Sequence, residues 1–193
     1  ARIELESDPV LRRRLGRFVV VGGGFSGVEV AGALADFLRS ARRYYPRVAA
    51  QELQVVLIEG GDRILPELPP ALSRAADGSM RSRGIEILLS ARAARMDADA
   101  VALEDGRVLD TATVICTIGA RANPLADALP FPKERGRIVT RPDLSVEGFE
   151  GVWAIGDCAL VRNAAGGAYA PPTAQFAIAQ ARTLARNIAA AAQ

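Results

Sequence analysis

The sequence predicts an α/β protein that begins with a parallel sheet wound with helices. In the first half of the chain, short apolar segments rich in β-branched residues alternate with segments whose apolar residues recur every three or four positions. A small antiparallel meander follows, and one more apolar segment then returns to the sheet. The 193 residues are 50% hydrophobic, which is enough for the core of one domain and part of a second.

The first strand and helix are predicted within residues 17–38. Residues 17–21 (RFVVV) form a short apolar run, which is typical of a buried parallel strand. The spacing of the next apolar residues predicts a helix with one buried face, made of Val28, Ala31, Leu34, Ala35 and Leu38.

The next two strands flank a second helix. After a polar connection at residues 39–51, residues 53–59 (LQVVLIE) predict a second buried strand. Prolines at positions 66, 69 and 70 precede a helical segment, and Gly84 is expected to end it. Residues 85–89 (IEILL) predict the third strand.

A hairpin leads into the returning strand. Residues 101–109 predict two short strands around an Asp105-Gly106 turn, and residues 111–119 predict another apolar strand. The order β-α-β-α-β, then a meander, is that of a mononucleotide-binding half of a doubly wound, Rossmann-like parallel sheet with a β-meander crossover.

The chain after Gly119 has a looser pattern. Prolines are frequent there, and two short strands are predicted within residues 138–160. A final helix is expected after Pro171 and Pro172, with an apolar stripe of Ala177, Ala181, Leu184, Ala185 and Ile188.

Composition excludes several kinds of site. The sequence has 24 Lys and Arg, 22 Asp and Glu, a net charge of +2 and no long basic run, so we expect no nucleic-acid partner. Histidine is absent, which excludes Ser-His-Asp and Cys-His catalysis and any His-ligated metal within these residues; we expect no metal site.

The remaining bulk features favour a cytoplasmic protein. The first nine residues are charged and do not form a signal peptide, and no apolar run reaches the ~18 residues that a membrane span needs. Cys116 and Cys158 lie outside any Cys-x-x-Cys pair, which is typical of a reducing compartment, and a single disulfide between them is the alternative. Both cysteines are expected to be small buried apolar residues.

Gly22, Gly24 and Gly27 have the G-x-G-x-x-G spacing of a dinucleotide loop. The first glycine permits a tight turn, the second lets the backbone approach a pyrophosphate, and the third lets the helix pack on the strand. A strand precedes this loop and a helix follows it, which is the context that the motif requires. A glycine-rich turn without a ligand is the alternative.

Glu59 ends the second predicted strand, where a carboxylate can accept hydrogen bonds from ribose hydroxyls and repel a 2′-phosphate. Positions 60 and 61 are glycines, so the sequence favours NAD(H) over NADP(H). Arg63 is the nearby cation that could favour the phosphorylated coenzyme. A solvated strand end is the alternative interpretation of Glu59.

In the segment VWAIGDCA at residues 152–159, a strand is expected to end in Gly156-Asp157, and a proline-led helix follows. This arrangement resembles the flavin-domain return segment of the two-dinucleotide-binding FAD/NAD(P) flavoproteins, the pyridine nucleotide-disulfide oxidoreductases. Within that superfamily the chain resembles type II NADH dehydrogenases, which are NADH:quinone oxidoreductases. The stretches that carry this resemblance are GGGFSGVEVAGAL, VVLIEGGDRILPELPPAL, TIGARANPL, and GDCA followed by PPTAQFAIAQARTLARNI.

The resemblance implies roles for individual residues in two cofactor sites. Glu29 would reach the nicotinamide and flavin region, although an acid in the first helical turn can also simply complement the helix dipole. Gln175 would also lie near a quinone, while a second glutamine falls at Gln180, one position later than the family often has it. The implied NADH residues are Gly22, Gly24, Phe25, Ser26, Gly27, Glu59 and Gly119, and the implied FAD residues are Gly156, Asp157, Gln175, Phe176 and Ala177.

The resemblance also implies an incomplete flavoprotein. Residues 1–120 would form the NAD(H)-binding domain and residues 121–193 the C-terminal portion of an FAD domain whose N-terminal half is absent, so the fragment alone is expected to be inactive. The intact protein would pass a hydride from NADH to FAD and electrons to an acceptor, with quinone as the first choice. Peripheral membrane association and a homodimer would involve a missing C-terminal part.

Three alternatives stay open. A ferredoxin or rubredoxin reductase has the same fold, and so does a disulfide reductase, although the first domain contains no Cys-x-x-Cys pair. A non-catalytic NAD(H)-binding module is the third alternative. NADH-dependent bleaching of a bound flavin would exclude this third alternative.

Overall fold

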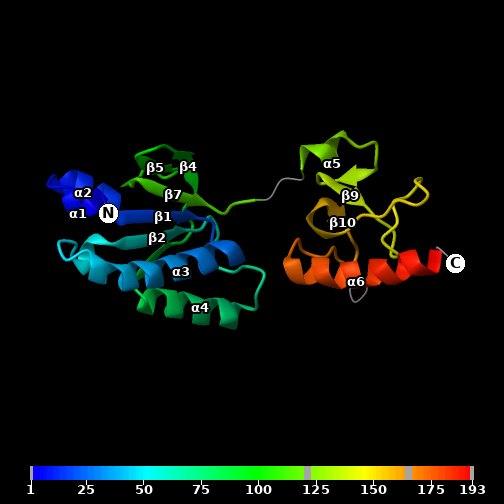
Figure 1. The fold of residues 1–193 in the computed structure, drawn as a ribbon, viewed down its shortest axis with the longest axis horizontal. Helices are drawn as coiled ribbons and strands as arrows, with labels where there is room; N and C mark the ends of the chain where they lie inside the picture. Colours follow the sequence, from blue (N-terminus) through cyan, green and yellow to red (C-terminus); the bar gives the residue numbers. More distant parts are fainter. Residues whose placement is uncertain (1, 120–122, 164–166, 192–193) are drawn as a thin grey trace. The chain divides into compact units, whose positions relative to one another are not determined.

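A computed structural model describes residues 2–119, 123–163 and 167–191. It contains two compact units, Ala1–Ile118 and Gly119–Gln193, which are described separately (Figure 1). The predicted domain boundary between residues 120 and 121 lies outside the described residues.

The first unit is built on a four-stranded parallel sheet, which confirms the predicted fold class. Its strand order is β3-β2-β1-β7, so the first strand in the sequence lies inside the sheet. Val19 pairs with Val56 on one side and with Val114 on the other. The strands are β1 (Arg17–Val21), β2 (Gln54–Ile58), β3 (Ile85–Leu88) and β7 (Thr113–Cys116).

Two helices cover one face of this sheet, and the meander covers the other (Figure 1). Helix α3 (Phe25–Ala41) and helix α4 (Pro70–Ser82) pack on the face that contains Val20 and Leu57. The meander consists of β4 (Ala93–Met96), β5 (Ala100–Leu103) and β6 (Val108–Asp110). Strand β4 is not predicted from sequence because its side chains are mostly exposed and do not alternate.

Arg12 holds the N-terminal helices against the connection between α3 and β2. Its guanidinium binds both carboxylate oxygens of Glu52, at 2.7 and 2.9 Å, and also donates to the carbonyl oxygens of Ile3, Glu6 and Arg47. The hydrogen bonds from Arg12, followed by the one from the Ala49 N–H, lower the pKa of Glu52 from 4.5 to about 2. Arg12 lies in α2 (Pro9–Gly16), and its partners lie in or beside α1 (Arg2–Leu5) and η2 (Ala50–Glu52). The 3₁₀ turn η1 (Arg42–Tyr44) comes earlier in the same connection.

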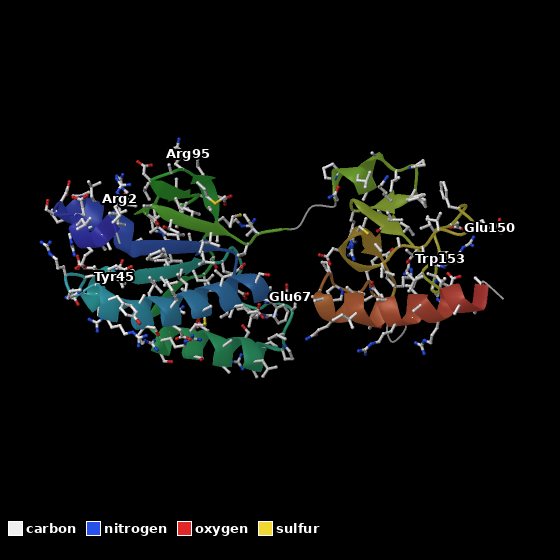
Figure 2. All side chains as sticks on the ribbon, in the orientation of Figure 1. Arg2, Tyr45, Glu67, Arg95, Glu150 and Trp153 are labelled. Carbon is white, nitrogen blue, oxygen red and sulfur yellow. The ribbon has the colours of Figure 1, made fainter. Side chains whose placement is uncertain are left out.

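Glu52→Gln is expected to lower the melting temperature by several degrees at pH 7 and by much less near pH 2. Because folding lowers the pKa of Glu52, its stabilisation is complete above the unfolded value and is lost as the pH falls through about 2. Thermal unfolding at several pH values between 7 and 2 measures this. Glu67→Gln, at an exposed position without an ion-pair partner among the described residues (Figure 2), is the control. Equal losses at both ends of the pH range would contradict the prediction.

The second unit contains a small sheet and one long helix. Strand β9 (Arg137–Val139) lies between β8 (Lys133–Glu134) and β10 (Ala159–Leu160), and it runs parallel to β10. Buried Ile138, Val146 and Ala159 belong to its core. The remaining elements are α5 (Pro124–Ala128), η3 (Gly156–Cys158) and α6 (Ala174–Ala191).

One predicted strand in this unit is wrong in position. Trp153 forms only an isolated bridge with Ser145, and the regular strand β10 begins after the GDC segment instead of ending in it. Gly156 has a φ of +71°, which is incompatible with an extended strand. It is the first residue of the 3₁₀ turn η3.

The predicted apolar stripe of α6 is also partly wrong. Ala181, Ala185 and Ile188 are exposed, whereas Gln180 is buried. Gln180 is turned inward because its Oε1 accepts a hydrogen bond from the Gly156 N–H at 2.8 Å. The Asn187 side chain, on the same face, donates to the Asp143 carbonyl oxygen at 2.7 Å.

Candidate functional site

The glycine loop joins β1 to α3. Gly22 has a φ of +111°, which an L side chain rarely adopts, and its N–H donates to the Ile58 carbonyl oxygen at 2.8 Å. A Cβ at Gly27 would overlap the Gly22 carbonyl oxygen, so α3 can start this close to the strand only with glycine there. The fold itself therefore requires both glycines.

Gly24 differs from these two glycines. Its φ and ψ of −72° and −173° suit any residue, and a Cβ there would meet no heavy atom within 4 Å. It is the N-cap of the 17-residue helix α3, whose first N–H groups lack intrahelical partners. Glycine at this position keeps space open in front of a positive helix end, where an anion can bind.

The carboxylate of Glu59 is fixed against this loop. Its Oε2 accepts a hydrogen bond from the Gly23 N–H at 2.7 Å, and its Oε1 accepts one from the Gly61 N–H at 2.6 Å. The Leu65 N–H donates to the Gly23 carbonyl oxygen at 2.7 Å, so the segment after β2 holds the loop from both sides. Glu59 is half-buried rather than freely solvated.

A cavity of about 470 Å³ lies beside Glu59, at the carboxyl ends of β1 and β2. Open α/β sheets bind ligands at this end of their strands. The cavity is lined by Val21, Gly22, Ile58, Glu59, Gly60, Gly61, Ala91, Arg92, Ala93, Glu104 and Ile118. Arg63 is absent from this lining, and its guanidinium donates instead to the Pro66 carbonyl oxygen at 3.0 Å.

Thr117 supports the loop from the neighbouring strand and is not predicted from sequence. Its Oγ1 lies 2.8 Å from the Val21 carbonyl oxygen and 3.2 Å from that of Gly22. Because Val21 pairs with Cys116, the next residue after β7 falls beside Gly22. Only the strand register reveals this contact.

Four other predicted residues lie in the open. Phe25, Ser26 and Glu29 are exposed in the first turns of α3, and Glu29 has no hydrogen bond or ion pair to any described residue. Gly119, with a φ of +70°, is the first residue of the second unit.

In the second unit, the predicted flavin residues surround the start of α6. A Cβ at Gly156 would lie 3.7 Å from that of Ala177, so η3 and the first turns of α6 are in contact. Asp157 and Gln175 are exposed, and Phe176 and Ala177 are half-buried. Asp157 makes no hydrogen bond or ion pair with the described residues, so its carboxylate can accept from ligand hydroxyls beside the helix N-terminus.

Comparison with known proteins places the chain in a family. Residues 2–181 match the family described as pyridine nucleotide-disulphide oxidoreductase. The chain belongs to this family. The chain is 32% identical to a probable NADH dehydrogenase of Dictyostelium discoideum, over 91% of the chain and 39% of that protein. This membership confirms the family that the sequence motifs predict.

The chain is also similar to two named kinds of reductase. The chain is 29% identical to the type II NADH:quinone oxidoreductase Ndh of Mycobacterium tuberculosis, over 97% of the chain and 41% of that protein. A ferredoxin reductase structure from Rhodopseudomonas palustris matches with a TM-score of 0.71 and 28% identity, over 92% of this chain and 43% of that one. This pyridine nucleotide-disulphide oxidoreductase chain spans about two-fifths of the length of the relatives it matches.

The two cysteines of the chain are both free thiols. The prediction that both are buried is wrong for Cys116, which is exposed at the last position of β7. Cys158 is half-buried, and its Sγ donates to the Ile155 carbonyl oxygen at 3.3 Å. In the described part of the chain, no three His, Cys, Asp or Glu side chains are grouped to hold a metal, and no helix is long and apolar enough to cross a membrane.

A larger cavity of about 540 Å³ lies at the other end of β1. Its lining is mainly apolar and includes Arg42, Arg43, Tyr44 and Tyr45, but none of the predicted site residues. Figure 2 shows Arg2 and Tyr45 at this end of the first unit and Glu67 at the opposite end. This larger cavity is therefore separate from the glycine loop and Glu59.

Proposed function

We propose that this chain is the NADH-binding part, and a portion of the FAD-binding part, of an FAD-dependent NADH oxidoreductase whose acceptor is a quinone. The observation that carries the proposal is the open space at Gly24 beside the fixed carboxylate of Glu59. Family membership and the name of the Mycobacterium tuberculosis relative support it.

The glycine loop would hold the pyrophosphate of NADH. Backbone N–H groups at the start of α3 would donate to its oxygens, and the missing side chain at Gly24 would allow their approach. Glu59 would accept hydrogen bonds from the adenosine ribose in the adjoining cavity. A 2′-phosphate would bring negative charge next to this carboxylate, which favours NADH over NADPH.

The start of α6 and Asp157 would hold part of FAD. The exposed carboxylate would accept hydrogen bonds from ribityl hydroxyls, and the N-terminus of α6 would stabilise negative charge on the ring. FAD, when bound, supplies the chemistry by accepting the hydride of NADH at N5 and passing two electrons to the acceptor. The residues of this chain orient the two cofactors and need not act as acid or base, which is compatible with the absence of histidine.

The choice of quinone as the acceptor is supported by the names of relatives and not by a pocket of the structure. The names of the relatives from Mycobacterium tuberculosis and Staphylococcus aureus, type II NADH:quinone oxidoreductase, favour quinone as the acceptor. With a quinone acceptor we expect the full-length protein to attach peripherally to the cytoplasmic face of a membrane. The similarity to a ferredoxin reductase keeps ferredoxin as the second candidate.

The experiment uses the full-length protein that contains this chain. NADH oxidation is followed in parallel with a soluble quinone, a ferredoxin and a disulfide, and anaerobic NADH is added to observe bleaching of a bound flavin. We expect bleaching and the highest rate with quinone. No rate with any quinone would contradict the proposed acceptor.

Asp157→Ala separates the two cofactor sites in the same protein. We expect it to lower the flavin content after purification while NADH binding is unchanged, because Asp157 belongs to the second unit. Unchanged flavin content would contradict the role given to Asp157.

A further inference from the structure

We propose that Arg92 is a second selectivity residue for the coenzyme, able to bind a 2′-phosphate once the charge of Glu59 is removed. The inference rests on the proposed NADH site and adds to it the cation of the adenosine cavity. Both side chains line the same 470 Å³ cavity.

The backbone holds the segment before Arg92 alongside Glu59. The Ala91 N–H donates to the Glu59 carbonyl oxygen at 2.9 Å, and the Ser90 N–H donates to the Gly61 carbonyl oxygen at 2.7 Å. On its other side, the Arg92 carbonyl oxygen accepts from the Glu104 N–H at 2.9 Å. Arg92 is therefore anchored at the cavity by the fold and not by a flexible loop.

The side chain of Arg92 lies across Gly60. A Cβ at Gly60 would be 3.1 Å from the Arg92 Cγ and 3.4 Å from its Nε. Glycine at position 60 therefore leaves room for this side chain next to Glu59. Arg63 is nearer in sequence but does not line the cavity.

The guanidinium of Arg92 has no partner of its own in the described part of the chain, where no carboxylate lies within 4 Å. The oxygens of Glu59 already accept hydrogen bonds from Gly23 and Gly61. A free guanidinium can bind a phosphate through two parallel hydrogen bonds and can stack on an adenine ring. The negative charge of Glu59 therefore opposes a 2′-phosphate, and removing that charge lets the already free Arg92 guanidinium bind one. Glu104, the other carboxylate of the cavity lining, is unchanged in this comparison.

The test measures dissociation constants of NADH, NADPH and adenosine 2′,5′-bisphosphate for the full-length protein by calorimetry. The proteins are the wild type, Glu59→Gln, Arg92→Gln and the double variant. Because a glutamine amide nitrogen cannot accept the hydrogen bond that one Glu59 oxygen accepts, the affinities for NADPH and the bisphosphate are expressed relative to that for NADH in each protein. We expect Glu59→Gln to raise these relative affinities by about tenfold, and the added Arg92→Gln change to remove the gain. The bisphosphate lacks the nicotinamide half, so it reports on the adenosine cavity and the adjoining glycine loop.

Arg63→Gln in the Glu59→Gln background is the matched control, and we expect it to keep the gain. Equal effects of Arg92→Gln and Arg63→Gln, or no gain in Glu59→Gln, would overturn the role of Arg92. If the wild type still binds NADH in that case, the proposed function is unaffected. A wild type that binds neither coenzyme would overturn both.

Discussion

Gly27→Ala is expected to abolish NADH binding and to lower the free energy of unfolding by about 2–4 kcal/mol. A Cβ at this position would overlap the Gly22 carbonyl oxygen and would lie 2.9 Å from the Thr117 Oγ1. Both neighbours are fixed, so α3 must move away from β1 and its N-terminus must leave the loop. Denaturant unfolding and NADH titration of the full-length protein measure the two effects.

Gly16→Ala separates loss of stability from loss of the site. A Cβ at Gly16 would overlap the Glu52 carbonyl oxygen, which is also backbone, but Gly16 precedes β1 and the glycine loop follows it. We expect a comparable loss of stability with normal NADH affinity wherever the variant is folded. Normal NADH affinity in folded Gly27→Ala would contradict the packing role given to this glycine.

Gly24→Ala is expected to weaken NADH binding by more than about tenfold while the free energy of unfolding changes by less than about 0.5 kcal/mol. The position has ordinary backbone angles and open space around it, so the fold tolerates a methyl group there. A bound pyrophosphate would not tolerate it, because the methyl group would occupy the space through which its oxygens reach the N–H groups of α3.

Gly78→Ala is the matched control for this prediction. Gly78 also has open space and no positive φ, but it lies on the exposed side of α4. We expect a small gain in stability from higher helix propensity and no change in NADH affinity. Unchanged NADH affinity in Gly24→Ala would show that the open space beside Gly24 does not receive the coenzyme.

The fold of the first unit is largely predictable because its inner strands are continuous apolar runs. Residues 18–21 lie in β1 and residues 55–58 lie in β2, and all eight are apolar. Strand β4 and the true face of α6 are not predictable in this way. Exposed side chains leave β4 without alternation. In α6, the hydrogen bond from the Gly156 N–H turns Gln180 inward, and the surrounding alanines are too small to determine which helix face is buried.

Some residues of the candidate site are likewise predictable from sequence, and others are not. The loop glycines and Glu59 can be found from sequence, because each stands at the end of a predicted strand, and the structure gathers them at one end of the sheet. Thr117 and Arg92 reach the same place from segments distant in sequence. Their positions depend on the register of β7 with β1 and on backbone hydrogen bonds beyond β3.

The central claim is that the glycine loop and Glu59 together form an NADH site. Calorimetric titration of the wild-type full-length protein and of Glu59→Gln with NADH and NADPH tests it most directly. The wild type should bind one NADH per chain, at least about tenfold more tightly than NADPH, and Glu59→Gln should lose this preference. Absence of NADH binding, or an equal loss of affinity for both coenzymes in Glu59→Gln, would contradict the claim.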